Sequence, residues 1–316
     1  MKVIEFDVIF LSYDEPNADL HYADLCNKVP WAKRIHGIKG SDHAHKAAAE
    51  ASETDWFITV DADIIVDPRF FNIDLDMSDS KIKVYGWCGR NAINGLRYGN
   101  GGLKIWNKDF VLNMRTHENS DSDRGQVDFC WEDGYRNFPL TFSESVITGS
   151  PFQAWRAGFR EGVKMTLLDG VKVPSMEIKE RIWWHNIHRL RMWSTVGAHE
   201  ENGIYAVYGA RLGTWMANCT QWNYVDVRDF EILRDIYSQY GKPYEDVNGD
   251  GLIDEIKNLG EKIKMGLGLD WPFLDAQQSK FTLDLYNETM NLNDTYFKMP
   301  VPTNVRYLLC FSKQRK

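Results

Sequence analysis

The chain has 316 residues, of which 43% are hydrophobic and 26% charged, a composition that excludes wholesale disorder and allows one or two folded domains. Acidic residues outnumber basic ones by 45 to 37, and the net charge of -8 excludes an all-over positive coat for nucleic acid, but not a local basic face. Five scattered cysteines without a CxxC pair favour a reducing compartment. Because no signal-peptide pattern or membrane-spanning run is visible, we expect a cytoplasmic protein without a membrane partner.

The first third of the chain alternates between apolar runs and helix-forming segments. Strands are predicted at residues 6–12, 32–38 and 56–66, and helices at 17–28 and 43–51. Strands at this spacing, with helices between them, are typical of parallel βαβ units. The sequence therefore predicts an α/β fold with a Rossmann-like, mostly parallel sheet that is flanked by helices.

The later part of the chain has a different character. Two strands are expected first and three helices after them, at residues 83–87, 102–106, 151–165, 177–193 and 225–240. We expect residues 1–150 to form the α/β core. Residues 151–316 are expected to form a mainly helical extension that packs on the same domain.

Positive charge gathers in two segments of this extension. Residues 151–191 hold eight basic and four acidic residues, an excess of +4, and residues 298–316 hold five basic residues and no acid. A local basic face of this kind could bind double-stranded DNA despite the overall negative charge. The alternative is a set of ordinary solvated helix faces and a solubilising tail.

The sharpest motif is the pair Asp61 and Asp63 within the apolar run ITVDADIIV. Two carboxylates at the end of a buried strand carry a desolvation cost unless a cation neutralises them. Mg²⁺ and Mn²⁺ prefer carboxylate oxygens and bridge substrate phosphates, and open α/β sheets bind ligands at the carboxyl ends of their strands. On one regular strand both side chains would share a face. The alternative is a pair of turn aspartates that cap the next element.

Three segments, FDVIFLSYDE, KGSDHAHKAAAEA and WFITVDADIIVD, resemble the nucleotide-sugar half of a GT-A glycosyltransferase over residues 1–135. With SPFQAWRAGFREGVK and ENGIYAVYGARLG, the chain up to residue 213 further resembles proteins of T-even-like bacteriophages. That group is associated with glycosylating 5-hydroxymethylcytosine in phage DNA, including arabinosyl transfer. The resemblance implies a UDP-sugar donor, a divalent ion at the DxD aspartates, and the host cytoplasm as location if the protein is phage-encoded.

Carried over residue by residue, the resemblance implies a donor site from several parts of the sequence. The end of the first strand would lie near the nucleotide, and the second helix would line the ribose and diphosphate. Asp61 and Asp63 would hold the ribose or the metal ion. Two glycines before the strand LKIW would let the sugar approach, or would simply form a hairpin. Apart from the two aspartates, the residues are Ser12, Tyr13, Asp14, Lys39, Ser41, Asp42, His45, Lys46, Gly101 and Gly102.

The triplet Trp131-Glu132-Asp133 resembles the acceptor-side element that places a carboxylate at the reaction centre of these enzymes. Sugar transfer to a hydroxyl is helped by a base that removes its proton. We expect Glu132 or Asp133 to be that base, with Asp128 as a further candidate. The alternative is a solvated acidic loop.

Two other features suggest metal ligands. GT-A enzymes often add a histidine ligand, which implicates His188 and His199, with His185 as a further candidate; the alternative is that these histidines are packed. Residues 246–257 match the start of an EF-hand loop, but Lys257 stands where the bidentate glutamate belongs. A weak calcium site or a plain turn is therefore expected there.

The leading hypothesis is a metal-dependent glycosyltransferase that uses Mn²⁺ or Mg²⁺ and a UDP-sugar. The resemblance implies the hydroxymethyl group of 5-hydroxymethylcytosine in DNA as the acceptor. One alternative keeps the fold with a glycan or protein acceptor, which the net acidic charge favours. The other is a non-catalytic DNA- or carbohydrate-binding protein.

Overall fold

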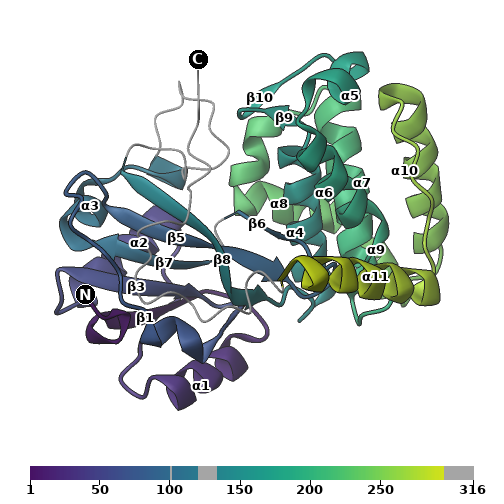
Figure 1. The fold of residues 1–316 in the computed structure, drawn as a ribbon. Helices are drawn as coiled ribbons and strands as arrows, with labels where there is room; N and C mark the ends of the chain where they lie inside the picture. Colours follow the sequence, from purple (N-terminus) through teal and green to yellow (C-terminus); the bar gives the residue numbers. More distant parts are fainter. Residues whose placement is uncertain (100–101, 120–133, 295–316) are drawn as a thin grey trace.

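An eight-stranded sheet organises the first half of the chain in the computed structural model, which describes residues 1–99, 102–119 and 134–294 (Figure 1). The strand order is β2-β1-β3-β7-β5-β8-β4, and β6 pairs with β5 beside this path. The strands are β1 (Asp7–Ser12), β2 (Lys33–His36), β3 (Trp56–Asp61), β4 (Ile64–Val66), β5 (Val84–Asn91), β6 (Arg97–Tyr98), β7 (Leu103–Asn107) and β8 (Tyr135–Ser145).

The strands of this sheet run mostly in one direction. β1 pairs in parallel with β2 and β3, β7 runs antiparallel between β3 and β5, and β8 is parallel to β5. Five of the eight strands therefore share one direction, while β4, β6 and β7 oppose them. The predicted α/β fold, with a mostly parallel sheet flanked by helices, is confirmed.

Alternating strand side chains divide the core of the sheet into two layers. Val8 and Phe10 pack on the side of α1 (Ala18–Lys28), whereas Ile9 and Leu11 pack on the side of α2 (Ser41–Ala51) and α3 (Lys108–Asn113). Successive side chains of a strand point to opposite faces, so a strand that is covered on both faces must be apolar throughout. This requirement explains the continuous apolar run of β1.

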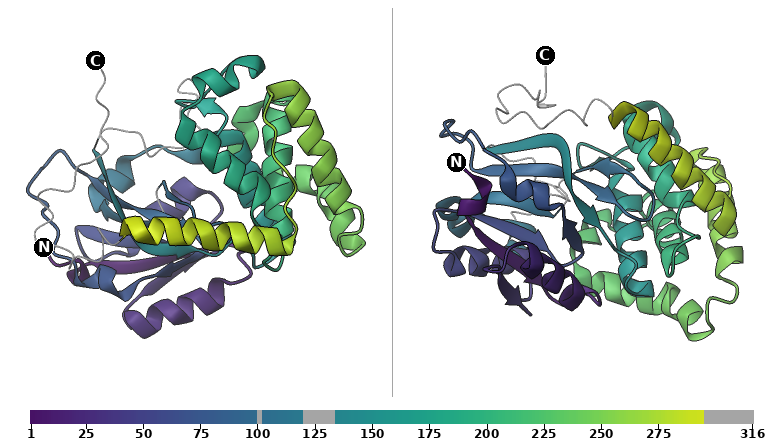
Figure 2. Two further views of the ribbon diagram at one scale, coloured as in Figure 1. Left: turned by 45° about the vertical axis from the view of Figure 1, so that its right-hand side comes forward. Right: turned by 60° about the horizontal axis from the view of Figure 1, so that its bottom comes forward.

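The second half of the chain is helical and lies beside the sheet (Figure 2). Its long central helix, α7, packs on α4, α6 and α10. Helix α11 returns toward the sheet, where Leu283 joins the apolar cluster of Ile93 and Leu96. The helices are α4 (Pro151–Lys164), α5 (Ile178–Arg181), α6 (Trp184–Thr195), α7 (Gly203–Cys219), α8 (Phe230–Tyr240), α9 (Lys242–Asp246), α10 (Leu252–Leu267) and α11 (Ala276–Asp294). A small hairpin joins β9 (Leu167–Leu168) to β10 (Val171–Lys172). The helical carboxy-terminal extension predicted from the sequence is confirmed.

Helices α4 and α7 approach each other through glycines. A Cβ atom at Gly158 would lie 2.0 Å from the carbonyl oxygen of Ala206, and one at Gly209 would lie 2.2 Å from that of Trp155. Gly162 and Gly213, four residues further along their helices, are in equally close contact with the facing backbone. Because the facing backbone cannot move aside as a flexible side chain can, only glycine, which has a hydrogen atom in place of a side chain, fits at these positions. The contact fixes α4 firmly on the central helix.

Three expectations about elements differ from the structure. The single strand predicted at 56–66 is two strands, β3 and β4, which pair with different neighbours. The helix predicted at 177–193 is broken into α5 and α6. Strand β8 was not predicted. Among the described residues, no helix is long and apolar enough to cross a membrane.

Candidate active site

The DxD motif lies where β3 ends. Asp61 is the last residue of β3 and lies level with Leu11 of β1, one residue before the end of that strand. Asp63 lies in the turn that leads to β4, and the hydroxyl of Ser145 donates a hydrogen bond to its Oδ2 over 3.3 Å. The two carboxylates are therefore not neighbours on one regular strand, as we expected, but flank a break in it. Both remain at the carboxyl-end edge of the sheet.

The two carboxylates lie in an environment that disfavours their charge. Burial raises the pKa of Asp61, and the charge of Glu15 adds to this effect. Burial likewise raises the pKa of Asp63 to about 6, with further increases from the charges of Asp61 and Glu15. Arg160 opposes the shift at Asp61, and Arg156 opposes it at Asp63. The residues around the motif therefore compensate its negative charge only in part.

Gly102 lies directly against the motif. Its φ of +64° falls in the left-handed region, and a Cβ atom there would lie 2.8 Å from Oδ2 of Asp61 and 2.7 Å from Cγ1 of Ile64. Only glycine meets both conditions without strain. Gly102 is thus in close contact with the motif itself, and its predicted role beside the donor sugar stays a prediction; Gly101 lies outside the described residues.

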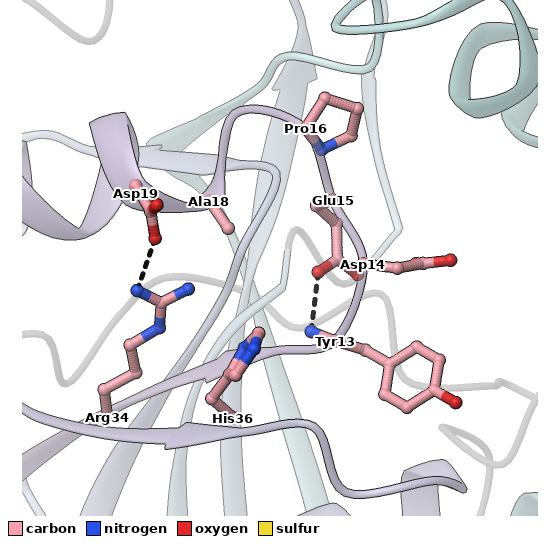
Figure 3. Close-up of a pocket in the computed structure, with 8 residues that line it drawn as sticks. All are labelled: Tyr13, Asp14, Glu15, Pro16, Ala18, Asp19, Arg34 and His36. Atoms are coloured by element: carbon pink, nitrogen blue, oxygen red, sulfur yellow. Dashed lines mark hydrogen bonds and ion pairs between the residues drawn. The ribbon is translucent and has the colours of Figure 1, made fainter.

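A pocket of about 500 Å³ opens at the ends of β1 and β2 (Figure 3). Arg34 Nε donates a hydrogen bond to the hydroxyl oxygen of Ser12 over 2.8 Å, and the same hydroxyl is hydrogen-bonded to Nδ1 of His36 over 2.9 Å. Glu15 folds back and accepts a hydrogen bond from the main-chain amide of Tyr13 over 2.8 Å (Figure 3). The lining residues are Tyr13, Asp14, Glu15, Pro16, Ala18, Asp19, Arg34 and His36. Two of the three residues predicted to lie near the nucleotide, Tyr13 and Asp14, thus line the pocket, and Ser12 supports it.

Two helices of the extension, α4 and α8, place arginines beside Asp14, in the loop that follows β1. Arg156 of α4 lies 3.9 Å from Asp14 Oδ1, and Arg234 of α8 forms an ion pair with the other oxygen of that carboxylate. The guanidinium groups of Arg156 and Arg160 lie 4.9 and 5.1 Å from the ring centre of Phe230. The sequence placed both α4 arginines in the basic segment 151–191, which could form a face for DNA or an ordinary solvated helix face. In the structure their charges act on Asp61 and Asp63 at the end of β3.

Lys104 and Glu15 are further candidates that sequence reasoning missed. Lys104 is buried on β7 beside Thr59 of β3, and its positive charge opposes the raised pKa of Asp61. The charge of Glu15, in the loop after β1, raises the pKa of both Asp61 and Asp63. No local pattern marks either residue, because their proximity to Asp61 depends on strand order and register.

Asp42 and Lys46, which were predicted to line the donor, are engaged within the protein. Asp42 is fully buried, and its Oδ1 accepts a hydrogen bond from the Thr116 amide over 3.2 Å. Its Oδ2 accepts from Asn119 Nδ2 over 2.7 Å and from Lys46 Nζ over 2.6 Å. These bonds tie α2 to residues 116–119. We therefore leave both residues out of the proposed donor site.

The other predicted residues around α2 occupy varied positions. His45 Nδ1 donates to the carbonyl oxygen of Ser41 over 2.7 Å, and the ring lies edge-on to Trp106 with centroids 5.0 Å apart. Burial lowers the pKa of His45 to about 4, so the side chain is neutral at pH 7. Lys39 is exposed and lies 3.3 Å from Glu231 at the start of α8. The predicted donor contacts of Lys39, Ser41 and His45 stay predictions.

The predicted histidine ligands lie on the extension. His188 packs against Tyr286 with ring centroids 5.8 Å apart, and His199 Nδ1 is 2.7 Å from Oγ of Ser279 on α11. His185 packs between Trp183 and Trp184. Within residues 1–99, 102–119 and 134–294, no group of three or more His, Cys, Asp or Glu side chains could hold a metal ion. The structure thus joins none of these histidines to the DxD pair, and it gathers no calcium ligands in the loop at 246–257.

The predicted catalytic residues Glu132 and Asp133 lie outside the described residues, as does Asp128. The basic segment at 298–316 also lies outside them. Their roles stay predictions.

Comparison with known proteins finds no matching family model and no matching curated protein. Among solved structures, a glycosyltransferase involved in the glycosylation of the major capsid of PBCV-1 is similar at a TM-score of 0.28 and 15% identity, covering 44% of this chain and 92% of its own. HddC from Yersinia pseudotuberculosis is similar at a TM-score of 0.29 and 14% identity, and the match covers 48% of this chain and 97% of HddC. The structure of HddC complexed with GMP-PN gives a TM-score of 0.31 and 14% identity, and covers 47% of this chain and 96% of HddC. Matches of this strength carry no weight for substrate or reaction.

Proposed function

We propose that the protein is a glycosyltransferase that takes its sugar from a nucleotide sugar with the help of a divalent cation. The observation that carries the proposal is the position of Asp61 and Asp63. They lie partly buried at the carboxyl end of β3, level with the end of β1. Ligands of open α/β sheets bind at this edge, and the adjoining pocket of about 500 Å³ gives room for a nucleoside.

The donor set at the motif fits Mn²⁺ or Mg²⁺. Two carboxylates whose charge is only partly compensated are the hard oxygen ligands that such ions prefer. Mg²⁺ is commonly held by one or two carboxylates plus substrate phosphates, so a third protein ligand is not required. When bound, the cation would stabilise the negative charge of the departing diphosphate.

The chain's own residues would bind and orient the donor. Tyr13 and Asp14 line the pocket, where an exposed ring can stack on a base and a carboxylate can accept hydrogen bonds from ribose hydroxyls. Gly102 allows Asp61 and Ile64 to pack directly against its backbone, which holds the Asp61 carboxylate in place. Glu132 and Asp133 stay our candidates for the base that removes the acceptor proton.

For the acceptor we propose 5-hydroxymethylcytosine in double-stranded DNA, on the strength of the sequence resemblance. An exposed set of side chains on the extension supports it: Trp183 and Trp184 are 53% and 78% exposed, beside Arg181 at the end of α5. Exposed aromatic rings next to cations suit bases and phosphates. They also suit sugars, so a glycan or glycoprotein acceptor is the second candidate.

The test is to incubate the full chain with Mn²⁺, a panel of UDP-sugars and DNA that contains 5-hydroxymethylcytosine, and to analyse the nucleosides by mass spectrometry. A nucleoside heavier by one sugar, absent with Asp63→Ala, supports the proposal. Transfer to glycans but not to DNA would favour the second acceptor.

Tight UDP-sugar binding without turnover on any acceptor would indicate a binding protein without catalytic activity, which is the remaining alternative. DNA binding that weakens steeply with salt would separate a DNA acceptor from a glycan acceptor, because phosphate contacts release counterions.

A further inference from the structure

Within the part of the chain that the structure describes, four acidic and four basic side chains from the sheet and the extension surround the DxD pair. The acids are Asp14, Glu15, Asp61 and Asp63, and the bases are Lys104, Arg156, Arg160 and Arg234. Their formal charges sum to zero. A divalent cation adds two positive charges, and a diphosphate diester adds two negative ones. The cluster is therefore balanced when both are bound together and unbalanced when either is bound alone.

The two arginines of α4, Arg156 and Arg160, are fixed in position by the side chains around them. Only 16% of the Arg156 side chain is exposed, and its guanidinium lies between the rings of Phe152 and Phe230, at 5.5 and 4.9 Å from their centres. Arg160, one helical turn further, shares the Phe230 ring at 5.1 Å. The glycine contact with α7 fixes the helix that carries them.

The partner of Arg156 within the protein is a weak one. Its distance of 3.9 Å from Asp14 is longer than a hydrogen bond, whereas Arg234 contacts the other oxygen of the same carboxylate. A guanidinium that is buried beside aromatic rings is suited to bidentate binding of a phosphate. Such a position does not suit duplex DNA, whose backbone needs an exposed cation.

We propose, on the basis of the proposed function, that Arg156 and Arg160 of α4 bind the diphosphate of the nucleotide sugar, with Arg234 of α8 assisting. The sheet supplies the cation site, and the helical extension supplies the phosphate site. The nucleotide and the cation then bind cooperatively, because each compensates the charge that the other introduces.

The experiment measures the binding of inorganic pyrophosphate and of UDP by calorimetry, with and without Mn²⁺, and the binding of Mn²⁺ alone. In Arg156→Gln and Arg160→Gln we expect pyrophosphate and UDP affinity to fall by at least about tenfold, the loss expected when one charge-assisted bond is removed. Mn²⁺ alone should bind equally well or more tightly, because a positive charge near Asp63 has been removed. Arg156→Lys should recover part of the loss. Arg136→Gln is the matched control and should match the wild type, because this arginine pairs with Asp79 at the start of β8, at the end of the sheet opposite the DxD pair.

Equal pyrophosphate affinity in the wild type and both variants, or no pyrophosphate binding by the wild type, would overturn the assignment. Loss of duplex DNA binding with unchanged pyrophosphate binding would overturn it too, and would assign the arginines to an acceptor. Failure of the proposed function gives a different result: pyrophosphate binding that depends on Arg156, but no binding of UDP. Circular dichroism establishes that each variant is folded.

Discussion

The main-chain amide of Asp61 donates a hydrogen bond to the carbonyl oxygen of Gly102 over 2.9 Å, and the side chain of Asp61 turns back over the same glycine. The carboxylate is thus confined by the backbone of the neighbouring strand. We expect Gly102→Ala to displace it, since the new methyl group would lie 2.8 Å from Oδ2. A displacement of about 1 Å at a reaction centre costs roughly 100-fold in rate, so donor hydrolysis should fall by about that factor.

Gly99→Ala is the matched control for this variant. Gly99 also has a positive φ, of +67°, but no atom of the described residues lies within 4 Å of its hypothetical Cβ. Both substitutions carry a similar backbone strain of about 1 kcal/mol, and only one crowds Asp61. Equal donor hydrolysis in the two variants would show that the space beside Asp61 is unimportant.

Replacing Asp63 should stabilise the metal-free protein. The carboxylate has a pKa of about 6 when folded, against 3.8 as the ordinary value, because burial disfavours its charge. Above pH 6 the folded protein therefore holds an unfavourable charge, worth about 3 kcal/mol. Asp63→Asn removes it and keeps an acceptor for Ser145. We expect urea denaturation in EDTA to show a gain of up to that size at pH 7.5.

The gain should shrink as the pH falls from 6 toward 4, because the wild-type carboxyl then becomes protonated in the folded state. A gain that is absent at pH 7.5, or undiminished at pH 4, would contradict the assigned pKa. Stabilisation together with loss of donor turnover would identify Asp63 as a residue kept for function at the expense of stability.

His45 should produce the opposite pH dependence. Burial lowers its pKa from 6.5 to about 4, so below pH 6.5 the unfolded chain takes up a proton that the folded protein does not. This contribution favours unfolding increasingly down to pH 4, by about 3 kcal/mol in total. In His45→Gln, the free energy of unfolding should fall less steeply between pH 7 and 4, as followed by urea denaturation. Parallel pH profiles for the variant and the wild type would contradict the prediction.

The glycine contact between α4 and α7 should tolerate no side chain. In Gly209→Ala a methyl group would lie 2.2 Å from the carbonyl oxygen of Trp155, and we expect a loss of roughly 1–3 kcal/mol in thermal unfolding. Gly266→Ala is the matched control, because its nearest neighbour is the sulfur of the exposed Cys219, which can rotate away. That variant should be neutral or more stable, since alanine favours a helix. Equal stability of the two variants would disprove the close contact.

Local patterns predicted much of the sheet. The apolar run of β1, the alanine-rich α2 and the motif after β3 each carry their signal within about ten residues, so their existence and order followed from the sequence. Strand β8 could not be predicted in this way, because Pro139 and the polar residues around it are untypical of a strand that pairs within a sheet, as β8 does with β5. Helix α7 is buried almost all round and therefore lacks the amphipathic period by which helices are recognised.

The candidate site was predicted only in its local part. Asp61 and Asp63 are separated by one residue in the sequence, so their chemistry could be inferred from the motif alone. The approach of Arg156 to Asp14 joins positions 142 residues apart and depends on how the extension packs on the sheet. Asp42 shows the converse. The resemblance implied a ligand contact for this residue, whereas its oxygens accept hydrogen bonds from the amide of Thr116 and the side chains of Asn119 and Lys46.

The most direct measurement is a titration of the full chain with Mn²⁺ in the presence of UDP, followed by electron paramagnetic resonance. We expect one bound ion in the wild type, and affinity weaker by about 100-fold in Asp61→Asn and Asp63→Asn, whose neutral amides are poorer ligands. Binding of Mn²⁺ that is equally tight in the wild type and both variants would contradict the assignment of the cation to the end of β3.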